Sequence, residues 1–158
     1  MTRRILGVDP GLNITGYGVL QSDGHDVRLL EAGVVTSHAR TLAGRINDIY
    51  TGIQDVLAQY KPEALALEEL YSHYKRPMTA VLMGHVRGAI CLAAAQSGIP
   101  VVPYAATKIK RTLTGNGRAT KEQMQRAITV TFHLKSVPNP PDVADAAAIA
   151  LCHYYHSR

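Results

Sequence analysis

Residues 4–18 read R-I-L-G-V-D-P-G-L-N-I-T-G-Y-G, and this stretch guides the interpretation of the whole chain. The apolar, β-prone residues 5–8 are followed at once by a Pro-Gly pair, which predicts a short buried strand with Asp9 at its carboxyl end. Gly11 and Gly16 indicate that the backbone turns tightly there, before a returning strand begins near Tyr17. The stretch therefore predicts a carboxylate at the end of a central strand.

Two interpretations of Asp9 stay open at this point. An aspartate beside glycines commonly caps the N–H groups of a turn. Alternatively, the carboxyl edge of a central strand is where open α/β sheets keep their sites, and a metal ion there would offset the cost of burying the charge. The remainder of the sequence has to decide between a turn residue and a metal ligand.

The hydrophobic pattern predicts an α/β fold. A third strand is expected at residues 28–36, and short connections predict that the first three strands form an antiparallel meander. Apolar residues recur at helical spacing over residues 41–60. A short buried strand follows at residues 64–68, and a right-handed crossover would place it parallel to the first strand.

The second half of the chain completes this pattern with further α/β units. We expect helices at residues 77–97, 106–113, 121–132 and 142–156, and a fifth strand at residues 101–102. The sum is a single domain over residues 1–158, with a five-stranded mixed sheet and helices on both faces. Three antiparallel strands come first and α/β units follow.

The chain is basic and has the composition of a compact globule. Its 158 residues carry a formal net charge of +5, with 46% hydrophobic and 18% charged residues. Such a charge favours a polyanionic partner, and nucleic acid is the usual one. No run approaches the ~18 apolar residues of a membrane span, so we expect a cytoplasmic protein with no membrane partner. Cys91 and Cys152 lack metal spacing and are expected to be core thiols.

Acidic residues recur after a central strand and at the start of the last helix. Glu68, like Asp9, is the first acidic residue after an apolar strand, so both are expected at one sheet edge. Glu69 follows directly, and strand periodicity favours Glu68 only mildly. Asp142 and Asp145 lie on one helix face. A first-turn role at free N–H groups explains Asp142 about as well as catalysis does, but it explains Asp145 less well.

A cluster of these carboxylates would need cations. Like charges held close together raise each other's pKa values unless positive charge neutralises them. Oxygen ligands without Cys or His favour Mg²⁺ or Mn²⁺ over Zn²⁺. Two such ions ~4 Å apart can activate a water and stabilise the leaving oxygen of an in-line phosphoryl displacement. We therefore expect two Mg²⁺ ions per subunit, with Mn²⁺ able to substitute.

Two groups of basic and aromatic residues accompany the acids. Directly after the glutamate strand come Tyr71, Tyr74, Lys75 and Arg76. Aromatic rings interleaved with cations suit nucleic-acid contact, although a solvated surface loop also explains them. Around a Gly-Asn-Gly turn lie Lys108, Lys110, Arg111, Arg118 and Lys121. The glycines let backbone N–H groups approach a phosphate, while an exposed helix position is the better interpretation of Lys108 and Arg111.

Four motifs resemble the RuvC family of Holliday junction resolvases, in the order that the family has them. They are V-D-P-G-L-N-I-T-G-Y-G (residues 8–18), A-L-E-E-L-Y (66–71), G-N-G-R-A-T-K-E (115–122) and N-P-P-D-V-A-D-A-A-A-I-A (139–150). The resemblance covers nearly the whole chain. It implies a ribonuclease-H-like fold and a homodimer that makes paired, Mg²⁺-dependent nicks in four-way DNA junctions, leaving 5′-phosphate and 3′-hydroxyl ends. It also implies a role in recombination and repair, with a branch-migration helicase complex as partner.

The resemblance assigns roles to individual residues of this chain. Its catalytic and metal-binding acids fall on Asp9, Glu68, Asp142 and Asp145, which chooses Glu68 over Glu69. Lys110 and Lys121 are implied to lie nearest the scissile phosphate, and we expect Lys121 to assist catalysis.

The resemblance also bears on DNA contacts and on the dimer. Tyr71 stands where the family often has phenylalanine, and it is expected to enter the crossover. The DNA is expected to contact Tyr74, Lys75, Arg76 and Arg118 as well. The helix that contains Gly84 and Gly88 is placed at the dimer axis.

Three rival functions remain. An actin-like ATPase shares the Asp-x-Gly turn but needs two lobes, which 158 residues hardly provide. A non-catalytic junction-binding module would be expected to lack part of the acidic set. A nuclease of the same fold that acts on RNA is not excluded by the residues alone.

Overall fold

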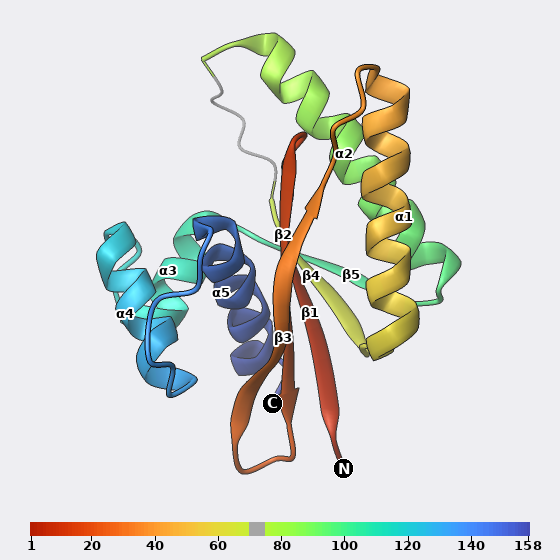
Figure 1. The fold of residues 1–158 in the computed structure, drawn as a ribbon. Helices are drawn as coiled ribbons and strands as arrows, with labels where there is room; N and C mark the ends of the chain where they lie inside the picture. Colours follow the sequence, from red (N-terminus) through yellow and green to blue (C-terminus); the bar gives the residue numbers. More distant parts are fainter. Residues whose placement is uncertain (70–74) are drawn as a thin grey trace.

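A five-stranded sheet forms the centre of the molecule (Figure 1). The structure, a computed structural model, describes residues 1–69 and 75–158. Its elements are β1 (Arg3–Asp9), β2 (Ile14–Ser22), β3 (Val27–Thr36), α1 (Leu42–Tyr60), β4 (Ala64–Glu68), α2 (Pro77–Gln96), β5 (Val101–Tyr104), α3 (Ala106–Thr114), α4 (Lys121–Thr131) and α5 (Pro141–His156).

The strand order confirms the predicted mixed sheet. The order is β3-β2-β1-β4-β5, with β1 in the middle. β1 pairs antiparallel with β2 and parallel with β4, while β2 and β3 are antiparallel and β4 and β5 parallel. Because β1 and β4 run the same way, their carboxyl ends reach the same edge of the sheet.

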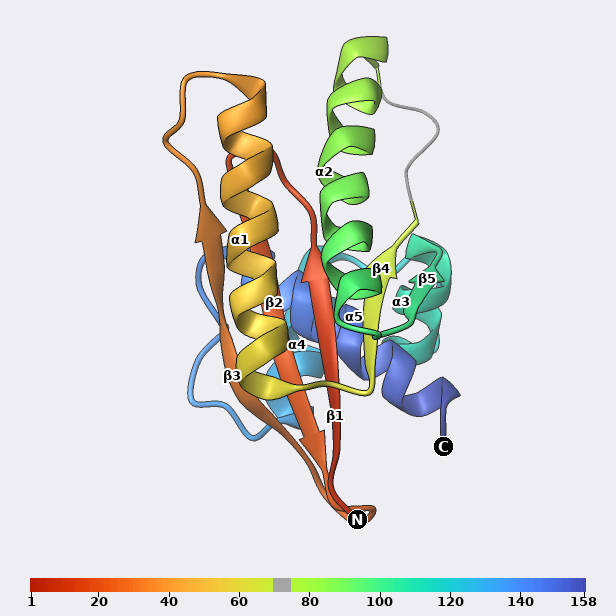
Figure 2. The same ribbon diagram turned by 90° about the vertical axis from the view of Figure 1, so that its right-hand side faces the viewer.

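Helices cover both faces of the sheet, each over its own apolar cluster. α1 and α2 pack on one face, against side chains such as Leu6, Val8 and Leu67 (Figure 2). α5 packs on the other face, with Ile5 and Ala66 beneath it and with α3 and α4 beyond it. Successive strand residues alternate between these clusters, so Asp9 and Glu68 share the α5 face with Ile5 and Ala66.

Glycines in β1 and β2 allow α5 to approach the sheet closely. A Cβ atom placed on Gly7 would lie 2.1 Å from the carbonyl oxygen of Ala146, and one on Gly16 would lie 2.3 Å from that of Asp142. The expectation that Gly16 forms part of a turn is wrong, because it lies within β2 opposite Asp9. Its lack of a side chain makes room for the first turn of α5.

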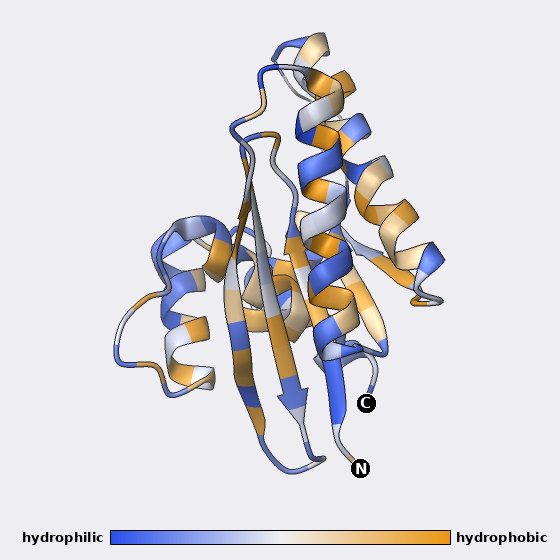
Figure 3. Cartoon of the chain, turned by 45° about the vertical axis from the view of Figure 1, so that its right-hand side comes forward, coloured by the Kyte–Doolittle hydropathy of each residue, from blue (hydrophilic) through white to orange (hydrophobic). Residues whose placement is uncertain are grey.

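α2 is apolar on more than its inner face (Figure 3). By length and composition alone this helix could cross a membrane, which corrects the expectation that no run approaches a membrane span. One such helix is weak evidence for a span, and Val86, Ile90 and Ala93 pack fully buried in the α1/α2 cluster. Cys91 on α2 is exposed, so only Cys152 is the expected core thiol.

Candidate active site

Four carboxylates from three separate parts of the chain gather at one edge of the sheet. Asp9 is the last residue of β1 and Glu68 the last residue of β4. The parallel pairing of these strands runs to Val8 opposite Leu67, so Asp9 and Glu68 come next, side by side. Asp142 and Asp145 lie in the first turns of α5, above the same face.

The environment of Asp9 is strongly unfavourable to a free negative charge. Burial is the largest cause that raises the pKa of Asp9, to about 8 from the usual 3.8. The charges of Asp145, Asp142 and Glu68 raise it further, and so does a hydrogen-bonding interaction with Asp142. The other three carboxylates therefore all act on Asp9, as the predicted cluster requires.

The turn interpretation of Asp9 loses its support in the structure. The N–H of Gly11, inside the turn, donates to the hydroxyl of Thr15 at 3.2 Å, and that hydroxyl donates to the Gly11 carbonyl at 2.8 Å. The hydroxyl of Thr15, which is fully buried, thus holds the turn. Asp142 makes no side-chain cap at the start of α5, where Pro140 is the N-cap residue. Asp9 is left for another role, while Asp142 lies in the first turn of α5, where the helix dipole also favours its charge.

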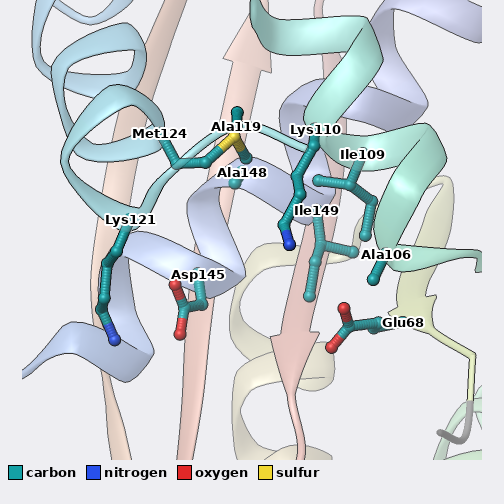
Figure 4. A pocket seen from close by; sticks show the side chains of 10 residues that line it. All are labelled: Glu68, Ala106, Ile109, Lys110, Ala119, Lys121, Met124, Asp145, Ala148 and Ile149. Carbon is teal, nitrogen blue, oxygen red and sulfur yellow. The ribbon is translucent and has the colours of Figure 1, made fainter. Parts of the chain in front are cut away.

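Two lysines face the carboxylates across a cavity of about 240 Å³ (Figure 4). Glu68 and Asp145 line one part of it, and the amino groups of Lys110 on α3 and Lys121 on α4 point toward them. Apolar side chains complete the wall: Ala106, Ile109, Ala119, Met124, Ala148 and Ile149. The pocket presents both charges at once, which suits an anionic group held through a cation.

The lysines offset only part of the negative charge. Burial raises the pKa of Glu68, Asp145 raises it further, and the cations Lys110 and Arg87 act in the opposite direction. Although Asp145 is exposed as a residue, removal of its carboxyl group from water raises its pKa, and Lys121 partly opposes this. The pKa values of Glu68 and Asp145 remain above their usual values. With four carboxylates and only two lysines at this edge, negative charge is in excess when the carboxylates are ionised.

This excess is what divalent cations would neutralise, and the donor set is oxygen only. Among residues 1–69 and 75–158, no three His, Cys, Asp or Glu side chains stand ready around one point. The four carboxylates thus share one edge of the sheet without forming a ready-made ligand set. The donor chemistry of Asp9, Glu68, Asp142 and Asp145, oxygen only, is the kind that Mg²⁺ or Mn²⁺ prefers.

The remaining predicted site residues lie farther from this pocket or outside the described part. Arg118 is exposed, and its N–H donates to the side chain of Asn116 within the turn. Lys75 and Arg76 are exposed just before α2. Tyr71 and Tyr74 fall outside the described residues, so their predicted contacts with DNA stay predictions.

One residue near the site was missed by the sequence analysis. Arg87 on α2 donates a hydrogen bond to the backbone carbonyl of Glu68. The signal for it was available, because Arg87 is the only charged residue between Arg76 and Lys108. An isolated arginine in an apolar helix needs a partner, but the sequence does not say which one.

Several known proteins are similar to this chain in sequence and in fold. Residues 5–153 match the family model for crossover junction endodeoxyribonuclease RuvC. The crossover junction endodeoxyribonuclease RuvC of Rhodopirellula baltica is 53% identical over 152 residues, which cover 96% of this chain and 85% of that protein. RuvC of Caldanaerobacter subterraneus is 39% identical, over 95% of this chain and 91% of that protein.

Solved structures agree with the sequence relatives. T. thermophilus RuvC in complex with Holliday junction substrate has 35% sequence identity and a TM-score of 0.92, over 99% of this chain and 95% of that chain. The yeast mitochondrial Holliday junction resolvase has a TM-score of 0.66 at 11% identity, so it supports the fold alone. With this agreement in sequence, fold and motif order, the chain belongs to the RuvC family of crossover junction endodeoxyribonucleases.

Proposed function

We propose that this chain is a metal-dependent endonuclease that cuts four-way DNA junctions by phosphodiester hydrolysis. The observation that carries the proposal is that four carboxylates from three parts of the chain gather at one sheet edge of a basic protein, with two lysines opposite. The T. thermophilus relative in complex with Holliday junction substrate supports the substrate class. We further propose Mg²⁺ as the physiological ion, two ions per subunit, and Mn²⁺ as a substitute.

The chemistry divides among the residues of the pocket. Asp9, Glu68, Asp142 and Asp145 would hold the ions, which supply an activated water and charge stabilisation at the phosphate when bound. Lys121, beside Asp145, would stabilise negative charge that develops on the scissile phosphate. The phosphodiester bond breaks on the 3′-oxygen side, which leaves a 5′-phosphate and a 3′-hydroxyl.

The charge distribution along the chain suits a DNA partner. Between Glu69 and Glu122 the sequence has no acidic residue, and its basic residues are Lys75, Arg76, Arg87, Lys108, Lys110, Arg111, Arg118 and Lys121. Phosphate contacts by such residues position a nucleic acid without reading its sequence. Lys75, Arg76, Lys110 and Arg118 are proposed to hold the junction arms, and Tyr71 and Tyr74 to stack on bases.

A homodimer through α2 would give the paired nicks that the resemblance implies. Met78, Val81 and Leu92 on α2 are 64%, 53% and 51% exposed. A mainly apolar groove of about 500 Å³ runs between α1 and α2, with Leu92 and Ala89 in its wall. The two glycines of α2 have open space beside them. A second copy of the chain, related by a two-fold axis, is the proposed occupant of this face.

The test compares a synthetic mobile four-way junction with a linear duplex of the same sequence. Wild-type protein is expected to nick the junction in Mg²⁺, to bind it without nicking in Ca²⁺, and to leave the duplex intact. Asp9→Asn should still bind the junction but lose cleavage. The matched control is Asp55→Asn, the same change at an exposed position of α1, which should cleave like wild type.

Three outcomes would contradict the proposal. Cleavage by Asp9→Asn at the wild-type rate would remove Asp9 from the metal site. Equal cleavage of an RNA–DNA hybrid would favour the RNA alternative, and ATP hydrolysis without DNA would favour the ATPase alternative, neither of which the family relatives support. A branch-migration helicase partner stays a proposal that follows from the family resemblance, and a cytoplasmic location stays a proposal from the sequence pattern.

A further inference from the structure

Arg87 connects α2 with the end of β4 that forms part of the active-site edge of the sheet. It is half-buried on α2, which packs on the face of the sheet away from α5 and the pocket. Its guanidinium Nη1 donates to the backbone carbonyl oxygen of Glu68. The arginine thus contacts the main chain of a proposed metal ligand from behind, without lining the pocket.

The carbonyl of Glu68 needs such a donor because of the strand register. Along a strand, the N–H and C=O groups of successive residues point alternately to the two neighbouring strands. The N–H groups of Leu65 and Glu69 donate to the β5 side, to Pro100 and Tyr104, at 2.9 and 2.8 Å. Because the direction alternates with each residue, Glu68, directly before Glu69, directs its carbonyl toward β1.

On β1 the donor that would continue the ladder is missing. The β1–β4 pairing stops at Val8 opposite Leu67. The next donor in this parallel register would be the N–H of residue 10, which is Pro10 and has none. A carbonyl at a half-buried strand end without a hydrogen-bond donor would cost free energy. Arg87 supplies the donor from another layer of the molecule.

We propose that Arg87 is a positioning residue, which replaces the ladder hydrogen bond that Pro10 cannot make and so fixes the Glu68 end of β4 for metal binding. The inference rests on the proposed function only in that Glu68 is taken as a metal ligand. Groups that orient metal ligands typically change metal affinity 10- to 100-fold when they are removed. Arg87 is thereby distinct from Lys110 and Lys121, which face the pocket itself.

The test measures binding of Mn²⁺ alone to the full chain, without DNA, from the free-ion signal in electron paramagnetic resonance. Arg87→Met removes the donor and keeps the length, and it should weaken Mn²⁺ binding at least about tenfold. Arg87→Lys keeps a donor and should recover part of the loss. The matched control is Arg28→Met, at an exposed position of β3, which should bind Mn²⁺ like wild type.

A second-site variant tests the missing N–H directly. Pro10→Ala gives β1 a backbone donor at the position where the register requires one. In the double variant Pro10→Ala/Arg87→Met, part of the lost Mn²⁺ affinity should return relative to Arg87→Met. Equal affinities of the single and double variants would show that the carbonyl of Glu68 is not the cause, and would overturn the proposal.

Thermal unfolding in EDTA separates positioning from general stability. A lower melting temperature of Arg87→Met with unchanged Mn²⁺ affinity would assign Arg87 a structural role only and overturn the inference. Weaker junction binding in Ca²⁺ with unchanged Mn²⁺ affinity would make it a DNA contact instead. Because the titration contains no DNA, a wild-type protein that binds Mn²⁺ but leaves junctions uncut would refute the proposed function and leave this inference standing.

Discussion

The position of Asp9 is unfavourable for the stability of the metal-free protein but suits the binding of a metal ion. Its position at the end of the central strand brings burial and three neighbouring carboxylates, which raise its pKa to about 8. Near neutral pH the metal-free site thus tends to hold a proton where the proposed activity needs an ion. Binding of Mg²⁺ in place of that proton would convert an unfavourable cluster into a ligand set.

The first prediction concerns stability and pH without metal. Asp9 keeps its proton up to about pH 8 when folded, whereas the usual value for the unfolded chain is 3.8. Between these values the folded state binds more protons, so stability should fall as the pH rises, by up to ~1.4 kcal/mol per pH unit from this group. Denaturant unfolding in EDTA at several pH values from 5 to 8 measures the slope.

Asp9→Asn is the control for this slope. It removes the titrating group and should flatten the pH dependence, although Glu68 and Asp145, whose pKa values are also raised, keep part of it. Saturating Mg²⁺ should stabilise the wild type at pH 8 and have little effect on Asp9→Asn. A wild-type stability that rises from pH 5 to 8 would contradict the assigned environment.

Lys121 provides the second prediction at this scale. Lys121→Met should bind the junction in Ca²⁺ but cleave it about 10²-fold more slowly, the usual loss for one transition-state donor. Lys135→Met, at an exposed position after α4, is the matched control and should cleave normally. Single-turnover cleavage rates separate the effect from binding. An equal loss of cleavage rate in both variants would show that Lys121 contributes only general positive charge and has no specific role at the scissile phosphate.

At the scale of elements, local patterns were sufficient for the helices and insufficient for their contacts. The amphipathic pattern predicted α1, and Thr41 caps it through its side chain. In contrast, Gly16 was predicted as a turn residue, because only the approach of α5 shows what it makes room for. Arg87 was missed for the same reason: its partner depends on a strand register that no local pattern contains.

Gly16 yields the prediction that belongs to this scale. In Gly16→Ala the new methyl group would meet the backbone of Asp142 at 2.3 Å, so the first turn of α5 has to move away from Asp9. We expect a loss of ~1–3 kcal/mol in unfolding free energy and a much larger loss of cleavage. Gly18→Ala, whose methyl group would lie 3.3 Å from Ala147, should be milder in both measurements.

At the scale of the molecule, the sequence predicted the sheet and the acidic edge but misjudged the outer surface of α2. An apolar pattern on all sides of a helix does not reveal which side is covered, so Cys91 was expected in the core and is exposed. The placement of this helix against α1 and the sheet depends on long-range packing. The same exposure is the reason to look for a second copy of the chain there.

The last prediction tests this face through the oligomeric state. Leu92→Asp places a charge on the outer side of α2, where Leu92 is 51% exposed, and should convert a dimer to a monomer in light scattering after gel filtration. Val130→Asp, on α4 and 66% exposed, is the matched control and should stay dimeric. Each Leu92→Asp monomer keeps its own carboxylates and lysines, so Mn²⁺ binding should survive while paired nicking of one junction is lost. A wild-type protein that is monomeric at high concentration, or a dimer that Leu92→Asp leaves intact, would place the two-fold axis elsewhere or remove it.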